Sequence, residues 1–246
     1  MFRSLHIAAT GMAAQETQLE GVANNIANAN TTGFKRQRIE FQDLLYQTVR
    51  GAGTRTTEST RSPTGIQLGS GVRVVGTSRE FSQGNIMVTN NPLPLRILLQ
   101  RAGALQKDSE GQLVTPEGYL IDPPIIIPQD AVSVTIGSDG TVSALIDAET
   151  APTEIGQLTT ASFVNPAGLN ALGKNLFMET SASGEAQVGE PGSDGRGALL
   201  QGALERANVD VVEEMIGMIS AQRAYEVNTK VVTTADEMLR SATQMK

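Results

Sequence analysis

The sequence contains no cysteine and no tryptophan, and its single histidine is His6. Without cysteine, the chain has no disulfides, no thiolate metal ligands and no cysteine nucleophile. A single histidine is too few for a metal site built from histidines, and it leaves His6 as the one residue that could serve as the histidine of a catalytic triad. Aromatic residues make up 4% of the chain and charged residues 18%, so large core side chains are few. These absences indicate a function other than catalysis, with no cofactor, no metal and no catalytic residue.

Long apolar runs are also missing, and this predicts no direct insertion into a membrane. The N-terminus lacks the uninterrupted apolar region of a cleaved signal peptide, so we expect a cytosolic protein or one exported without such a signal. The 246 residues are enough for one large domain or two modest ones.

The net charge is −7, unevenly distributed along the chain. Residues 1–61 carry seven basic and five acidic residues, so this part is +2 and the remainder is −9. Neither part forms the basic stripe of a nucleic-acid-binding protein. We interpret the short cluster of Lys35, Arg36 and Arg38 as a solvated loop edge.

Both ends of the chain have the pattern of long helices. A helix is predicted over residues 4–28, because apolar residues recur at alternating spacings of three and four. Its heptad positions are Leu5, Ala8, Met12, Gln15, Leu19, Val22, Ile26 and Ala29. The residues from Asn28 to Gly33 are predicted to end the helix, and Gly33 can adopt a left-handed cap conformation.

The C-terminal helix is predicted to begin after Asn208 as N-cap and to run to about residue 243. Acidic side chains in its first turns suit the positive end of the helix dipole. It carries two apolar lines, which implies two partners. The first line is Val211, Met215, Met218, Gln222, Tyr225, Thr229, Val232 and Leu239; the second is Val212, Ile216, Ile219, Val227, Val231 and Met238.

The middle of the chain has the pattern of a mostly antiparallel β domain. The clearest hairpin joins residues 132–136 to 141–146 through Asp139-Gly140. Residues 51–70 and 181–197 are interpreted as extended loop or linker. Further strands are expected over residues 71–75, 112–114, 119–121, 125–127, 157–163 and 174–179.

Three features of the sequence are better explained as structural than as chemical sites. The segment Gly69-Ser70-Gly71 fails the dinucleotide-binding pattern, because position 74 is valine. The acidic residues Asp210, Glu213 and Glu214 fit helix N-terminal charge better than metal ligation or acid–base catalysis. His6 lies just off the heptad positions, so we expect it on a surface or interface.

Two motifs resemble those of the rod and hook axial proteins of the bacterial flagellum. The first runs from Asn24-Asn25 through Gly33-Phe34 to Lys35-Arg36, and the second from Asn208 through Met215 and on through residues 222–228. Residues 41–48, 63–73 and 82–91 resemble the distal-rod subunits of that family in particular. The resemblance departs from the family pattern around residues 92–101, where part of the pattern is absent: either the outer domain is truncated on one side or this stretch of sequence is irregular.

The resemblance implies an α+β fold in which the two terminal helices pair as a coiled coil and form an inner layer. The implied division is residues 1–33 for the N-terminal axial helix, 34–205 for a β-rich outer domain including an extended stretch at 46–72, and 206–246 for the C-terminal axial helix. It also implies a homo-oligomeric helical polymer that transmits motor torque to the hook. The implied partners are proximal rod subunits, the hook protein, surrounding ring proteins and the flagellar type III export apparatus. The implied location is the basal-body rod, which spans the periplasm.

The predicted self-assembly residues lie at the two ends, and a predicted rod-stiffening group lies in stretch 46–72. The asparagines at the end of the N-terminal helix, Asn24, Asn25, Asn28 and Asn30, are expected to fix register between copies. The self-assembly group is Leu5, Met12, Leu19, Val22, Asn24, Asn25, Ile26, Asn28, Gly33, Phe34, Val212, Met215, Ile216, Ile219, Gln222, Arg223, Tyr225 and Asn228; the stiffening group is Tyr46, Pro63, Gly65 and Gly71. Two alternatives stay open: a proximal rod or hook-type subunit, and a coiled-coil adaptor with a ligand-binding β domain.

Overall fold

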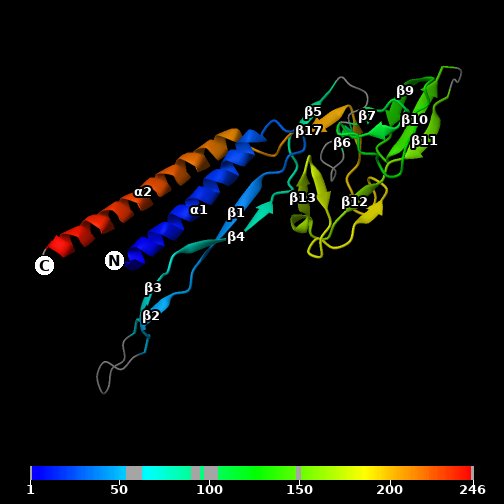
Figure 1. Cartoon of the computed structure of the whole chain (residues 1–246). Coiled ribbons are helices and arrows are strands. Elements are labelled where there is room, and N and C mark those ends of the chain that lie inside the picture. Colours follow the sequence, from blue (N-terminus) through cyan, green and yellow to red (C-terminus); the bar gives the residue numbers. More distant parts are fainter. Residues whose placement is uncertain (1, 54–62, 90–94, 97–104, 148–150, 245–246) are drawn as a thin grey trace. The chain divides into compact units, whose positions relative to one another are not determined.

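The computed structural model describes residues 2–53, 63–89, 95–96, 105–147 and 151–244. A long helix lies at each end of the chain, and the described segments between them form short strands (Figure 1). This element order confirms the expected mixed α+β class.

The chain divides into two compact units, and each is described by itself. The helix–hairpin unit comprises residues 1–27, 37–78 and 210–246. The β unit comprises residues 28–36 and 79–209. Residues 37–78 therefore cluster with the two terminal helices, although in the sequence they lie between the two segments of the β unit.

Helix α1 spans Phe2–Ala27, close to the predicted bounds. The chain then turns tightly: the Thr31 N–H donates to the Asn28 carbonyl (2.9 Å), and the Phe34 N–H donates to the Thr31 carbonyl (3.2 Å). Gly33 has φ 69°, the left-handed conformation that glycine adopts without a steric penalty. The predicted end of this helix is confirmed.

Helix α2 spans Val211–Gln244, and the predicted N-cap at Asn208 is wrong. Asp210 caps the helix, because its Oδ1 accepts from the Val212 N–H (2.9 Å) and the Glu213 N–H (3.3 Å). The Asn208 side chain is occupied elsewhere: its Oδ1 accepts from the Arg36 N–H at 2.7 Å.

Four strands complete the helix–hairpin unit. Strand β1 (Gln37–Asp43) pairs with β4 (Val72–Arg79), and β2 (Gln47–Arg50) pairs antiparallel with β3 (Ile66–Leu68). The β3 strand lies inside residues 51–70, so the interpretation of that whole stretch as loop is wrong. Ile66 and Leu68 are too few to give a periodic pattern, and the pairing with β2 makes them a strand.

The β unit is built from short paired strands, and its sheet β9–β10–β11 is the largest described. Thr141–Ile146 pairs antiparallel with Ala131–Ile136, which confirms the predicted hairpin. The strands are β5 (Ile86–Val88), β6 (Leu95–Arg96), β7 (Gln106–Lys107), β8 (Leu113–Val114), β9 (Ala131–Ile136), β10 (Thr141–Ile146), β11 (Thr153–Gln157), β12 (Thr160–Ser162), β13 (Asn170–Gly173), β14 (Leu176–Met178), β15 (Gln187–Gly189), β16 (Leu200–Gln201) and β17 (Ala203–Glu205), with a short 3₁₀ helix η1 at Pro166–Gly168.

Several predicted strands differ from those observed. The segment 157–163 is split between β11 and β12, and β15 lies within residues 181–197, which were interpreted as loop. Segments 119–121 and 125–127 form only isolated bridges, through Leu120 to Val114 and through Ile126 to Gln112. The prolines on both sides of residues 125–127 remove backbone donors, which limits ladder pairing there.

The core of the β unit lies between the β9–β10–β11 sheet and the neighbouring loops. Its buried residues come from distant parts of the sequence, so they hold the short strands together as one unit. They are Leu105, Leu113, Ile125, Ile127, Ile136, Val142, Leu158 and Leu199.

Candidate functional site

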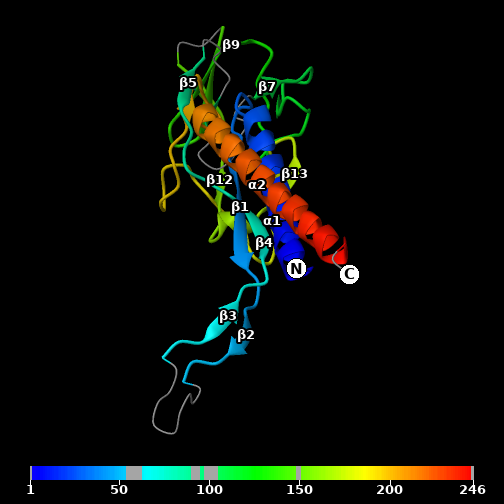
Figure 2. The ribbon, with the colours of Figure 1, turned by 90° about the vertical axis from the view of Figure 1, so that its left-hand side faces the viewer.

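The two terminal helices contact each other and run antiparallel (Figures 1 and 2). Near the end of α1, Asn25 Nδ2 donates to Glu214 Oε2 in the first turn of α2 (3.2 Å). Further back along α1, Met12 Sδ accepts from Thr229 Oγ1 at 3.6 Å. Residue numbers therefore fall along α1 as they rise along α2, and the N- and C-terminal ends of the chain lie at the same end of the pair.

Small and polar residues form the contact between these helices. An added Cβ at Gly11 would lie 2.9 Å from Asn228 Nδ2, so the backbone of α1 approaches that amide closely. The buried residues of α2 are Glu214, Ala221 and Ala235, and those of α1 are Ala8, Ala14, Gly21, Val22 and Asn25. The helices approach through small side chains rather than through a leucine-rich seam.

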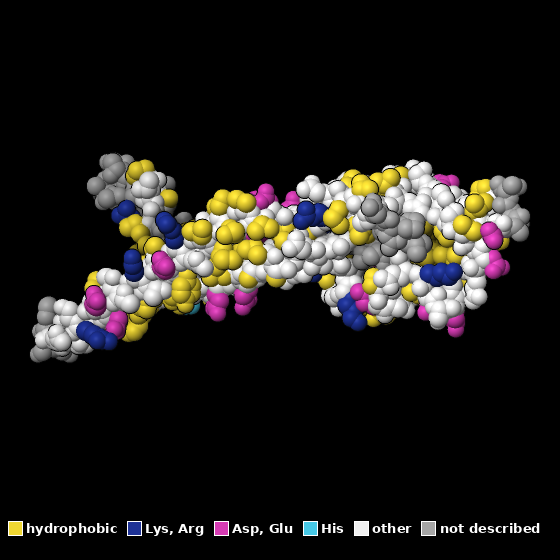
Figure 3. All heavy atoms as spheres, turned by 90° about the horizontal axis from the view of Figure 1, so that it is seen from above, with side chains coloured by type: hydrophobic (Ala, Val, Ile, Leu, Met, Phe, Trp, Pro, Cys, Tyr) yellow, Lys and Arg dark blue, Asp and Glu magenta, His cyan; other side chains and the backbone are white. Residues whose placement is uncertain are grey.

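The large apolar side chains of α2 are mostly exposed. Of the two predicted apolar lines, the described residues of the second are all exposed, and the first is half-buried only at Met218, Val232 and Leu239. Hydrophobic side chains gather along the helical part of the face seen in Figure 3. The exposed ones on α2 are Val211, Val212, Met215, Ile216, Ile219, Tyr225, Val227, Val231 and Met238.

The predicted self-assembly residues fall into three groups by exposure. The buried group is Val22, Asn25, Gly33 and Phe34; the half-buried group is Leu5, Met12, Leu19, Ile26, Asn28 and Asn228; the exposed group is Asn24, Val212, Met215, Ile216, Ile219, Gln222, Arg223 and Tyr225. His6 is exposed on α1, as expected. The structure therefore presents most of the predicted α2 residues to solvent and most of the predicted N-terminal ones to neighbours in the same chain.

Asn25 joins three elements of the helix–hairpin unit. Its Oδ1 accepts from the Gln37 N–H (2.9 Å), and its Nδ2 donates to the Gln37 carbonyl (2.9 Å) as well as to Glu214. The amide thus pairs with the first residue of β1 as a neighbouring strand would. Because the side chain is buried, these bonds tie α1, α2 and β1 together.

A buried ion pair in the β unit was not predicted. Lys35 Nζ lies 2.9 Å from Glu205 Oε1, with the side chains 3% and 6% exposed. The interpretation of Lys35 as part of a solvated loop edge is therefore wrong. Its position next to the apolar Phe34 is the sequence signal that could have indicated burial.

The predicted stiffening residues lie on or near the β2–β3 hairpin, which projects from the helices (Figure 2). Tyr46 and Pro63 are exposed. An added Cβ at Gly65 would lie 2.6 Å from the Arg50 carbonyl oxygen, so the strands leave no room for a side chain there. An open hollow of about 620 Å³ at the base of the hairpin is lined by Gln42, Asp43, Leu44, Leu45, Tyr46, Ser70 and Arg73.

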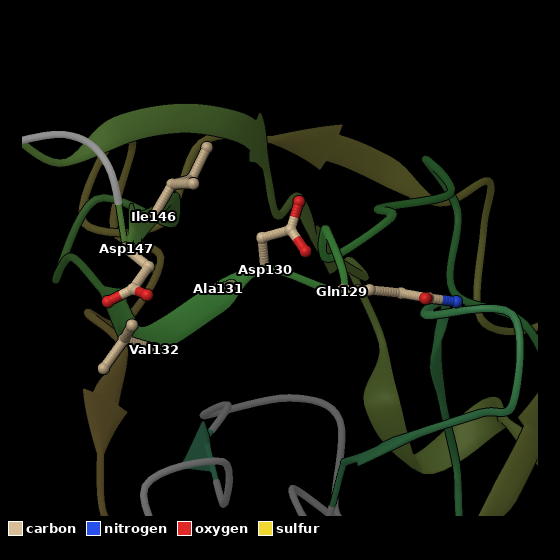
Figure 4. Close-up of a pocket in the computed structure, with 6 residues that line it drawn as sticks. All are labelled: Gln129, Asp130, Ala131, Val132, Ile146 and Asp147. Carbon is tan, nitrogen blue, oxygen red and sulfur yellow. The ribbon is translucent and has the colours of Figure 1, made fainter.

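A second hollow, of about 460 Å³, lies beside β9 and β10 in the β unit (Figure 4). The Asp147 N–H donates to the Asp130 carbonyl across it (3.3 Å), but the two carboxylates point in different directions. Within the described ranges, no group of three or more His, Cys, Asp or Glu is placed to hold a metal ion. This geometry offers no converging acid–base pair.

Comparison with known proteins gives a consistent family. Three family models match: "Flagella basal body rod protein" at residues 5–35, "Flagellar hook protein FlgE/F/G D1 domain" at 86–144, and "Flagellar basal body rod FlgEFG protein C-terminal" at 200–245. The flagellar basal-body rod protein FlgG of Caulobacter vibrioides is 45% identical over 260 aligned positions, which cover 99% of each chain. The chain belongs to the FlgG family of flagellar basal-body rod proteins.

Other FlgG relatives show the same full-length likeness. The protein of Borreliella burgdorferi is 45% identical, covering 100% of this chain and 99% of that protein. The Bacillus subtilis protein is 39% identical over 100% of both. The Caulobacter alignment has 260 positions and this chain has 246 residues, so the chain lacks residues at 14 or more of them. The expected departure at residues 92–101, by truncation or by irregular sequence, falls mostly outside the described residues.

Among the described residues, no helix has both the length and the hydropathy that crossing a membrane requires. The FlgG relatives are named as components of the flagellar basal body.

Proposed function

We propose that this FlgG-family chain is a non-enzymatic, structural subunit of the distal rod that polymerises through its terminal helices. The main support for this proposal is that the large apolar residues of α2 are exposed although α2 is already paired with α1. Contiguous exposed apolar surface of this kind marks a contact with another protein. Other copies of the same helices are the partners that a rod requires.

The coiled-coil arrangement is part of this proposal. In one copy, α1 covers the α2 face that contains Ala221 and Ala235. The exposed lines through Val212, Ile216 and Ile219 then remain for helices of neighbouring copies. Packing of several helices around one axis would place the terminal segments, 1–33 and 206–246, in an inner layer of a helical tube.

The β-rich residues 34–205 are proposed as an outer layer that braces neighbouring copies. Within it, the stretch 46–72 projects a hairpin with exposed apolar residues, including Val49, which is 61% exposed. A hairpin wedged between copies would resist sliding, so the tube would stay straight and would transmit torque from the motor to the hook. This role includes the predicted stiffening residues Tyr46, Pro63, Gly65 and Gly71.

The proposed surroundings follow from the rod assignment. Proximal rod subunits and the hook protein would contact the two ends of the tube, and ring proteins would surround it. The chain would pass unfolded through the flagellar type III export apparatus to a rod that spans the periplasm. The absence of cysteine fits this route, because no disulfide has to form before or after passage.

Polymerisation of the purified full-length chain tests the proposal. We expect concentration-dependent tubes in electron micrographs and fast-sedimenting species, both lost when residues 1–30 or 210–246 are deleted. Val132→Asp, which changes an exposed apolar residue of the β unit, serves as a folded control and should retain assembly through the helices. A chain that stays monomeric at high concentration and binds a small ligand would instead favour the adaptor alternative.

A further inference from the structure

Arg3, in the first turn of α1, reaches both strands of the β2–β3 hairpin. Its Nη1 donates to Gln47 Oε1 in β2 at 2.8 Å. Its Nη2 donates to the Leu68 carbonyl in β3 at 2.7 Å and to the Gly69 carbonyl at 3.3 Å. One guanidinium therefore holds three acceptors on two chain segments that are far from it in sequence.

A second contact joins α1 to the same segment. An added Cβ at Gly71 would clash with Thr10 Oγ1, and Gly71 has φ 118°, so the chain passes against α1 in a conformation that side chains disfavour. The Thr10 hydroxyl donates to the Ile7 carbonyl at 2.8 Å, which fixes its position on the helix. Arg3 and Thr10 are seven residues apart, and this spacing places them on one face of α1, two turns from each other.

Hydrogen bonds join the two sides of the hairpin at its base, so a contact that fixes one side also fixes the other. The Leu44 N–H donates to the Gly71 carbonyl at 2.9 Å, and Ser70 Oγ donates to the Leu45 carbonyl at 2.7 Å. A contact with the Leu68–Gly71 side is therefore transmitted to the segment that leads into β2.

We propose that the first turns of α1 form a docking site that sets the direction of the β2–β3 hairpin, with Arg3 as its positioning residue. The planar guanidinium is suited to this task, because it presents several donors in a fixed fork, whereas a lysine ammonium is a single point charge. The dock lies within one compact unit of one chain. Any effect of this docking site on rod stiffness rests on the proposed function, whereas the docking site itself does not.

The direction of the hairpin matters because several of its exposed side chains are apolar. Leu45, Tyr46 and Val49 lie on or beside β2, and Ile66 and Leu68 lie on β3. The docking site would determine which surface of a neighbouring copy these side chains can reach. It would also make the hairpin depend on folding of the N-terminal turns of α1.

A distance measurement between spin labels tests the dock directly. The chain has no cysteine, so cysteines introduced at Glu16 on α1 and Gln67 on β3, both exposed, are the only labelling sites. The full-length protein is kept unpolymerised and dilute. We expect one narrow distance distribution in the parent, and a clearly broader one with Arg3→Ala and with Gly71→Ala. Arg3→Lys should lie between them, and Arg38→Ala, an exposed arginine on β1, should match the parent.

Amide hydrogen exchange gives an independent readout. Arg3→Ala should speed exchange at residues 47–50 and 66–68 by about tenfold or more, the factor that loss of one charge-assisted hydrogen bond implies. Exchange at residues 131–146, in the β unit, should stay unchanged and shows that the variant is folded. A broad distribution in the parent, or a narrow one that survives both Arg3→Ala and Gly71→Ala, overturns the proposal. Because the subunit is measured unpolymerised, these results are independent of whether it forms a rod.

Discussion

Lys35 and Glu205 form a buried ion pair that holds several chain segments together. Beyond their mutual contact, Lys35 Nζ donates to the Ser82 carbonyl (2.6 Å), and Glu205 Oε1 accepts from the Gly84 N–H (2.6 Å). The pair thus joins the segment after α1, strand β17 and the segment 82–84. Since both charges are buried, each depends on the other for compensation of its lost hydration.

Replacing Lys35 by Met is expected to destabilise the protein strongly. The Glu205 carboxylate would then be buried without its counter-ion, and the free energy of unfolding should fall by about 3–5 kcal/mol. Urea unfolding of the purified variant measures this change. The double variant Lys35→Met, Glu205→Leu should recover part of the loss. A single-variant midpoint equal to that of Arg38→Met would contradict the structural role.

Asp139 provides a prediction about pH at the tip of the β9–β10 hairpin. Its Oδ1 accepts from the Thr141 hydroxyl (2.8 Å) and from the Thr141 N–H (3.2 Å). These bonds stabilise the carboxylate and lower the pKa of Asp139 below its ordinary value. A folded pKa below the unfolded one means that the contribution to stability is complete above the unfolded pKa. It is lost as the pH falls through the folded pKa.

Thr141→Val should therefore raise the pKa of Asp139 towards the ordinary aspartate value. The variant keeps the backbone donor and loses the hydroxyl donor, so a partial rise is expected. Titration of the Asp139 carboxyl resonance by NMR in the parent and in the variant checks it. An unchanged pKa would show that the hydroxyl does not bond to the carboxylate in solution.

At the scale of elements, α2 has two faces with different roles. Ala221, 4% exposed, faces α1, whereas Ile219, 50% exposed, belongs to the open apolar surface. The two residues are only two positions apart, so the same substitution at each one probes a different face of the same turn.

Ala221→Asp and Ile219→Asp should therefore fail in different ways. Ala221→Asp inserts a carboxylate into the α1–α2 contact, so we expect the isolated subunit to lose helix content. The second leaves the subunit folded but should abolish polymerisation and motility. Circular dichroism, sedimentation and a swimming assay separate the two effects. Normal swimming with Ile219→Asp would contradict assembly through this face.

The elements that could be predicted are those with strong periodicity. The bounds of α1 and the hairpin at Asp139-Gly140 follow from heptad spacing and from turn chemistry. The α1–α2 contact could not be predicted in this way, because Ala221 and Ala235 carry little hydrophobic signal and the large residues that do carry it face solvent. Strands such as β3 and β15 depend on a distant partner strand, so their short sequences have no pattern of their own.

Residues that act as junctions were missed for a related reason. Asn25 was predicted as a contact between copies, and that remains a prediction, but its buried amide also bonds to Gln37 and Glu214 in the same chain. Asn208 matched a helix cap by type, while Asp210 is the residue that caps. Choosing between two suitable polar residues requires knowing which backbone groups lie nearby, and those that bond to the Asn208 side chain come from Arg36 and from residues 80–82.

At the scale of the whole molecule, the exposed apolar residues of α2 imply assembly driven by burial of hydrophobic surface. Such burial has a negative heat-capacity change and weakens on cooling. Salt-bridge-driven assembly would respond to ionic strength instead.

We therefore expect polymers of this chain to dissociate in part in the cold. The critical concentration for polymerisation should rise when the temperature falls from about 25 °C to about 5 °C. Sedimentation of samples equilibrated at each temperature measures it, and a salt series at one temperature serves as control. A critical concentration that depends on salt but not on temperature would show that the apolar surface does not drive assembly.

The antiparallel contact between α1 and α2 depends on a fixed register of the two helices. Asn25 meets Glu214, and Met12 meets Thr229, so every contact along the pair depends on the number of residues between them. One inserted residue would rotate everything beyond it by about 100° about the helix axis, whereas a change of about seven residues would return the side chains to nearly the same face. A single residue added to either helix would therefore change the register of the pair. It would expose Ala221 or Ala235 and would turn the open apolar surface of α2 towards α1.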